Sequence, residues 1–190
     1  MNKGRVEAFT DGVIAIVITI MVLELKAPHS ADIAALVESA PVFLAYALSF
    51  VNVGIFWNNH HHMLHAAKYV DGRVLWANLA LLFFLSLVPF VIRWIDEAGI
   101  AAGPVAAYGA VLTGAGVTYT LLQAAIIAAN PDSMLPKMVG SDWKGKSSIV
   151  GYLIAIPLAF VSPWPSIAIY VAVSAMWFIP DRRIERTLPH

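Results

Sequence analysis

Long apolar runs are the feature of this sequence that most restricts its fold. A helix that crosses a bilayer needs about 20 mostly apolar residues, and the sequence contains several runs near that length. Hydrophobic residues make up 59% of the chain and charged residues 13%, whereas an ordinary soluble domain is about 45–50% apolar and about 25% charged. The chain is therefore predicted to be an all-α integral membrane protein.

Six transmembrane helices account for the apolar runs, in one domain that covers residues 1–190. Prolines cannot continue a helix, so Pro163 and Pro165 separate the last two runs. These two runs are shorter than the others and could instead form one re-entrant hairpin. The runs predict helices at about residues 6–25, 41–64, 74–95, 105–129, 148–161 and 166–179.

Basic residues are distributed unevenly among the segments between these helices. With the N-terminus in the cytoplasm, ten of the 12 lysines and arginines lie in cytoplasmic segments, and only Lys26 and Arg93 lie in outer loops. Because positive residues favour the cytoplasmic side, we expect a multi-pass protein of the cell membrane with both termini cytoplasmic. The ten residues are Lys3, Arg5, Lys68, Arg73, Lys137, Lys144, Lys146, Arg182, Arg183 and Arg186.

Composition and motifs exclude several classes of function. The 12 basic residues balance 12 acidic ones, so no nucleic-acid partner is expected, because nucleic-acid binding needs a basic patch. The sequence contains no H-E-x-x-H, G-x-S-x-G or Walker motif, so we predict neither an enzyme nor a cofactor. His61 and His65 have the spacing of metal ligands, but no Cys or nearby carboxylate completes a set, and no metal site is predicted.

Asp11 lies about one turn inside the first expected helix, where a carboxylate is costly unless it is paired. The second helix ends, and the third begins, on the same side of the membrane, so their polar residues lie at a similar depth. Indole, imidazole, guanidinium and amide groups can all donate hydrogen bonds to a carboxylate. We expect Asp11 to belong to a polar network, either purely structural or functional. Its candidate partners are Arg5, Trp57, His60, His61 and Asn78.

One stripe of the first helix is of interest for its position. With a rotation of 100° per residue in an α-helix, six residues between Gly12 and Ala27 fall on one face about 100° wide. The stripe is apolar, but so are most other faces of the helix, so periodicity alone does not distinguish packing residues from residues that face lipid or a pore. The stripe consists of Gly12, Ile16, Thr19, Ile20, Leu23 and Ala27.

Several short motifs in the first half of the chain occur together. Residues 5–12 form an R-x-x-x-F-[ST]-D-G pattern at the start of an apolar run, and residues 57–61 form W-x-x-H-H. The third helix carries L-W-A-N-L at 75–79 and closes with L-V-P-F at 87–90. Over residues 3–93 the chain resembles a prokaryotic member of the transmembrane protein 175 family, the endolysosomal potassium channels and their bacterial relatives. Thr10 stands where this family usually has Ser, and both residues carry a hydroxyl.

The resemblance implies a potassium-permeable cation channel, for which Rb⁺ and Cs⁺ are also expected to be permeant. In the bacterial relatives four six-helix chains form a homotetramer, and their first helices line a central pore that is unlike the classical potassium-channel fold. Carried over to this sequence, the hydrophobic constriction is formed by Ile16, Ile20 and Leu23. Thr19 would add a ring of hydroxyl oxygens for a partly dehydrated cation.

The resemblance also implies a structural network at the start of the first helix. The Arg/Phe/Ser/Asp cluster of the family maps onto Arg5, Phe9, Thr10 and Asp11. These residues are expected to hold the first helix against the second and third.

Physical arguments support a pore of this kind. A ring of aliphatic side chains can gate by dewetting. The sequence has no Thr-Val-Gly-Tyr-Gly filter, so the preference for K⁺ over Na⁺ is expected to be modest.

Two other functions stay open. In a proton-coupled or other secondary transporter, Asp11 with His60 or His61 would relay protons, although the sequence lacks an inverted repeat. A structural scaffold would conduct nothing. Modulation by pH through the histidines is a further hypothesis.

Overall fold

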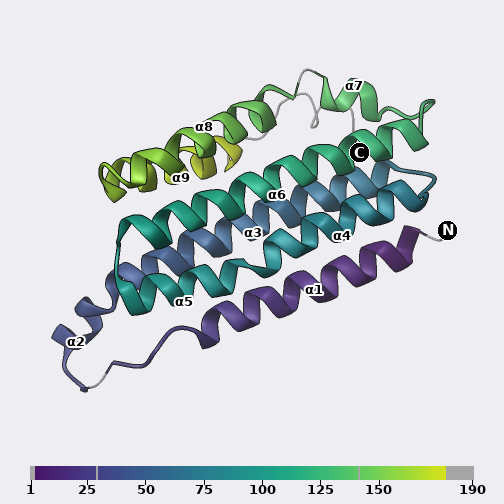
Figure 1. Ribbon diagram of the computed structural model, residues 1–190. Helices are drawn as coiled ribbons and strands as arrows, with labels where there is room; N and C mark the ends of the chain where they lie inside the picture. The colour runs from purple at the N-terminus through teal and green to yellow at the C-terminus, as the bar shows by residue number, and fades with distance from the viewer. Residues whose placement is uncertain (1–2, 29, 141, 179–190) are drawn as a thin grey trace.

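The computed structural model describes residues 3–28, 30–140 and 142–178, and the regular structure of these residues is helical (Figure 1). Within these residues, four segments are long and apolar enough to cross a membrane: Lys3–Leu23, Ala40–Ala66, Gly72–Ala98 and Ala102–Ala129. The helices are α1 (Lys3–Leu23), α2 (Ile33–Glu38), α3 (Ala40–Ala66), α4 (Gly72–Ser86), α5 (Val88–Ala98), α6 (Ala102–Ala129), α7 (Leu135–Val139), α8 (Trp143–Ala159) and α9 (Pro163–Phe178).

The last two helices form an antiparallel pair that lies along α6 (Figure 1). They contain 17 and 16 residues, and at about 1.5 Å per residue each is somewhat shorter than the roughly 30 Å hydrocarbon core. The count of six membrane-crossing helices therefore stays a prediction. Residue 179, the end of the sixth expected helix, lies outside the described residues.

The third expected helix, 74–95, is divided in the structure into α4 and α5, which meet at Leu87. Pro89 explains the break, because it has no N–H to donate and its ring would collide with the carbonyl group of Leu85 in a continuous helix. Since α5 continues in roughly the direction of α4 (Figure 1), the two helices still form one apolar segment.

Two aspartates mark where helices begin after the loops at one end of the bundle. Asp71 Oδ1 accepts a hydrogen bond from the backbone N–H of Val74 at 3.0 Å, and Asp142 Oδ1 accepts one from Gly145 at 3.2 Å. Such N-caps satisfy N–H groups that have no partner within the helix. The hydrogen bond from Val74 lowers the pKa of Asp71.

The loop between α3 and α4 is fixed to the end of α6 by Asn130. Its Oδ1 accepts hydrogen bonds from the backbone N–H groups of Lys68 and Tyr69, both at 2.8 Å, and its Nδ2 donates to the Tyr69 carbonyl at 2.9 Å. The N-terminus of α1 and the start of α8 lie at this same end of the bundle (Figure 1). We call this the basic end. Its described basic residues are Lys3, Arg5, Lys68, Arg73, Lys144 and Lys146, whereas Arg182, Arg183 and Arg186 lie outside the described residues.

Buried polar contacts tie α9 to the rest of the bundle. Asn52 of α3 donates from Nδ2 to Tyr108 Oη of α6 at 3.1 Å, and Ser174 Oγ of α9 donates to Asn52 Oδ1 at 3.0 Å. All three residues are buried. In an apolar setting such groups must pair with one another, so this network specifies how α9 sits on α3 and α6.

Helices α4 and α6 pack tightly at Gly114, where an added Cβ would collide with the ring of Phe84. We expect Gly114→Ala to destabilise the protein by about 1–3 kcal/mol, because the ring would have to leave its position in a packed core. The measurement is the thermal unfolding midpoint of the purified protein in detergent. Gly54→Ala in α3 is the matched control, since no heavy atom lies within 4 Å of its added Cβ. Equal midpoints for the two variants would contradict the prediction.

Candidate functional site

Helix α1 lies along one edge of the bundle, packed on α3, α4 and α5 (Figure 1). One of its faces is buried in the chain, and the opposite face is not. On the unpacked face, the exposed fractions of Ile16, Ile20 and Leu23 are 58%, 40% and 80%. Gly12 and Thr19 share this exposure, so the structure places the expected constriction residues together on a face that meets something other than its own chain. The buried face consists of Val6, Thr10, Ile14, Val17 and Met21.

The helix ends at Leu23, two residues before the expected boundary. Ala27 therefore lies in the connection to α2 and does not continue the stripe. In the structure the unpacked face ends with Leu23, which is the most exposed aliphatic side chain of α1.

The hydroxyl hydrogen of Thr19 is engaged in a hydrogen bond within α1. Its Oγ1 donates to the carbonyl oxygen of Ile16 at 2.9 Å, within α1. A hydroxyl has one hydrogen and two lone pairs, so on this exposed face Thr19 presents an oxygen rather than a donor.

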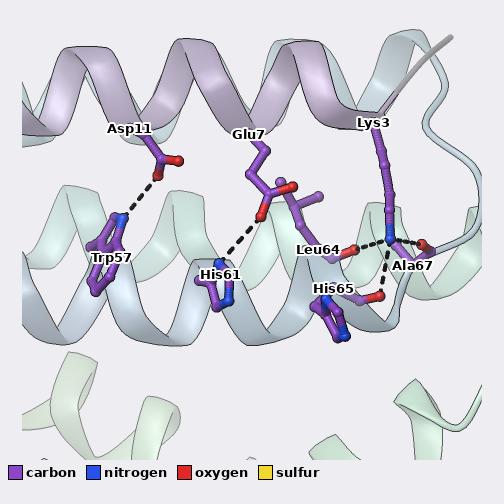
Figure 2. A network of polar contacts seen from close by, with 8 residues as sticks. All are labelled: Lys3, Glu7, Asp11, Trp57, His61, Leu64, His65 and Ala67. Carbon is purple, nitrogen blue, oxygen red and sulfur yellow. Dashed lines mark hydrogen bonds and ion pairs between the residues drawn. The ribbon is translucent and has the colours of Figure 1, made fainter.

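Asp11 is paired with Trp57 of α3, whose indole Nε1 donates to Asp11 Oδ1 at 2.8 Å (Figure 2). A hydrogen bond to an ionised carboxylate is stronger than one between neutral groups. Among the described residues Asp11 accepts this bond from Trp57 rather than from Arg5. Arg5 and Phe9 are both exposed, Phe9 by 54%.

A second, buried chain of hydrogen bonds joins α1, α3 and α4. Asn78 Nδ2 donates to Thr10 Oγ1 at 2.9 Å, and His60 Nε2 donates to Asn78 Oδ1 at 2.8 Å. The exposed fractions of the three side chains are 2% or less. The sequence indicates both Asn78 and His60 as candidate partners of Asp11, but Asn78 donates to the neighbouring Thr10 and His60 donates to Asn78. The hydroxyl that replaces the Ser of the related family accepts the bond from Asn78.

His61 faces Glu7, with 3.2 Å between Nδ1 and Oε1, and it is not a partner of Asp11 (Figure 2). Lys3 donates from Nζ to the carbonyl oxygens of Leu64, His65 and Ala67 at 3.4, 3.1 and 3.1 Å. Reasoning from the sequence missed both contacts. The available signal was a spacing of four, which places side chains on one side of a helix: it relates Lys3, Glu7 and Asp11 in α1, and Trp57, His61 and His65 in α3.

Acidic and basic side chains are paired at the end of the bundle opposite the basic end. Lys26 Nζ lies 2.6 Å from Asp96 Oδ2, and Arg93 Nε lies 3.0 Å from Glu97 Oε1 and 3.9 Å from Glu24 Oε2. The hydrogen bond with Asp96 raises the pKa of Lys26. These pairs connect the end of α1 to α5.

Comparison with known proteins relates these features to a family. A family model described as endosomal/lysosomal potassium channel TMEM175 matches residues 5–89, which include the α1 face and both hydrogen-bond systems. A potassium channel from Chryseobacterium sp. (strain P1-3) is 48% identical over 189 residues, which are 99% of this chain and 98% of that protein. The chain belongs to the TMEM175 family.

Other TMEM175 proteins are similar to part or most of this chain. A potassium channel from Chamaesiphon minutus is 31% identical over 88% of this chain and 89% of its own length. The crystal structure of a lysosomal potassium-selective channel TMEM175 homolog from Chamaesiphon minutus matches with a TM-score of 0.78 at 26% identity, and covers 95% of this chain and 97% of that one. The human endosomal/lysosomal proton channel TMEM175 is 40% identical over 96 residues, only 19% of its length.

Proposed function

We propose that this chain forms a potassium-permeable cation channel in the cell membrane. The observation that carries the proposal is the unpacked face of α1, on which Ile16, Ile20 and Leu23 lie exposed with Thr19 between them. The names of the full-length bacterial relatives support it, since they are called potassium channels.

The pore that we propose lies between subunits. One chain has a single α1, and an apolar face on one helix cannot enclose a channel. Four copies around a closed rotation axis would bring four such faces together, so that aliphatic side chains ring the axis and gate it by dewetting. In this arrangement all six longer helical segments cross the bilayer, and the basic end faces the cytoplasm in accord with the positive-inside rule. Both termini are then cytoplasmic.

Thr19 is the residue that we propose for the preference of K⁺ over Na⁺. Without a carbonyl filter, hydroxyl oxygens and the width of the pore select the ion, so the preference is modest. We expect Thr19→Val, which keeps the shape and removes the oxygen, to bring the permeability ratio of K⁺ to Na⁺ close to one. Reversal potentials under a KCl/NaCl gradient measure this ratio.

Thr113→Val is the matched control for that experiment. Thr113 makes the same kind of hydrogen bond to its own helix, from Oγ1 to the Gly109 carbonyl at 2.7 Å, but it lies in α6. Its ratio should equal that of the wild type. A reduced ratio in both variants would show that the loss of a hydroxyl acts through the fold and not through the pore.

Purified protein in a planar bilayer tests the channel itself. We expect unitary currents whose reversal potential follows the K⁺ gradient. The alternative is a secondary transporter, including a proton-coupled one that uses Asp11 with His60 or His61. That protein would give saturable flux coupled to protons and no unitary current.

A further inference from the structure

Among the residues that the structure describes, polar contacts tie α1 to α3 in the first half of α1 alone. Lys3, Glu7 and Asp11 meet the C-terminal half of α3 at successive turns, since the two helices run antiparallel (Figure 2). Hydrogen bonds and ion pairs require particular partners, so these contacts specify one register and one rotation of α1 on α3. We call this half of α1 the anchored half.

His61 is held in position from both sides along its own helix. Its ring stacks on those of Trp57 and His65, with centroid distances of 6.0 and 6.1 Å and interplanar angles of 26° and 24°. The stack limits where the imidazole can point, and Glu7 lies directly across from it. The side chains are partly exposed, 43% for His61 and 27% for Glu7, so protons from the solvent can reach the pair.

The second half of α1 has a different kind of contact. Ile14, Val17 and Met21 pack it on the bundle through apolar surfaces, and dispersion contacts of this kind have no strict direction. Within the described residues, the one hydrogen bond made by a side chain of residues 12–23 is that of Thr19 to its own helix. The gate residues therefore lie on a segment whose position on α3 is not fixed by polar contacts, and the ion pairs of Glu24 and Lys26 that follow it reach α5 instead.

We propose that Glu7 and His61 are positioning residues for the gate: their side-chain contact holds the anchored half of α1 on α3 and stabilises the arrangement described here against the other conductance state. This inference rests on the proposed channel function. The pair touches neither the pore face nor the permeant ion, so it acts on the equilibrium between states and not on the conductance of the open pore.

Protonation should strengthen the pair, because a charged imidazolium binds a carboxylate more strongly than a neutral imidazole does. The ionisable groups around His61 are Lys3, Glu7 and Asp11 of α1, and His60, His62 and His65 of α3. On α4 the neutral Asn78 lies next to His60. Of these groups Glu7 is the one that pairs with His61. The mean time that the channel spends in the arrangement described here should therefore lengthen as the pH falls.

Single-channel recording of the full-length protein tests the proposal, with wild type, Glu7→Gln, His61→Gln and the double variant at about pH 5.5 and about pH 8. At the lower pH we expect each single variant to shorten one of the two mean dwell times by about two- to fivefold, the range typical of a partly exposed ion pair. The other dwell time and the unitary conductance should not change. The double variant should equal the single variants, because a pair can be broken only once.

Two further variants make the outcome decisive. His61→Lys keeps a positive charge at both pH values, so it should restore the long dwell time and remove its dependence on pH. His62→Gln changes a neighbour that contacts His61 only edge-on and should behave as the wild type. Additive effects of the two single variants, or dwell times equal to those of the wild type, would overturn the inference while the wild-type current upholds the channel. Absence of current in the wild type would overturn both.

Discussion

The substitution Ile16→Asn should raise the K⁺ current through reconstituted protein by about tenfold or more. An amide at the constriction binds water, so the dry segment that stops ions is lost, and every ~1.4 kcal/mol removed from a barrier increases the rate about tenfold. Ile16→Ala widens the same position without wetting it and should give a smaller increase. The measurement is the mean current across a planar bilayer under a KCl/NaCl gradient.

The control for Ile16 is an exposed apolar residue on another helix. Leu121 of α6 is 57% exposed, close to the 58% of Ile16. Leu121→Asn should leave the current at the wild-type level. If Ile16→Asn also leaves the current unchanged, the pore lies on another face of the chain, and the exposed stripe of α1 meets lipid or a neighbouring subunit.

The largest effect on stability is expected at Asn78. Asn78→Leu keeps the approximate volume of the side chain but removes both of its hydrogen bonds, so that Thr10 and His60 become unpaired in a buried setting. Leaving buried polar groups without partners costs about 1–3 kcal/mol each. We therefore expect a lower unfolding midpoint and a smaller yield of monodisperse protein in detergent.

A second substitution distinguishes loss of hydrogen bonds from poor packing at Asn78. In the double variant Asn78→Leu with Thr10→Val, one of the two orphaned polar groups is also removed, and replacing both partners by apolar groups can be nearly neutral. The double variant should recover part of the lost stability. If it is less stable than Asn78→Leu alone, the shape of the leucine and not the missing hydrogen bond is the cause.

That the expected constriction residues share one face could be predicted because it depends only on local geometry, whereas their exposure could not be predicted from periodicity. Ile16, Ile20 and Leu23 share a face in any α-helix, and the burial of Val17 and Met21 leaves that face outside. The need of Asp11 for a partner was also predictable, since an unpaired carboxylate at that depth is costly. Trp57, in the C-terminal half of α3, was one of the candidate partners.

The choice among partners could not be predicted. Thr10 and Asp11 are adjacent and point about 100° apart around the helix, so a modest rotation of α1 decides which of them meets Asn78. Such a rotation depends on packing against α3 and α4, and no local pattern encodes it. The division of the third segment is another case: its overall hydropathy favours one span, whereas the effect of Pro89 is local.

The break at Leu87 has a mechanical consequence. The anchored half of α1 contacts α4 through Thr10 and Asn78, while the connection that follows α1 is joined to α5 by ion pairs of Glu24 and Lys26. The two halves of α1 thus rest on supports that are separated by an interruption in the helical backbone. A change in bilayer thickness that tilts α5 would be transmitted to the second half of α1. The register between α1 and α3 would not change. Tension in the surrounding lipid would therefore act on α1 through α5, whereas protonation of side chains at the basic end would act on it through α3.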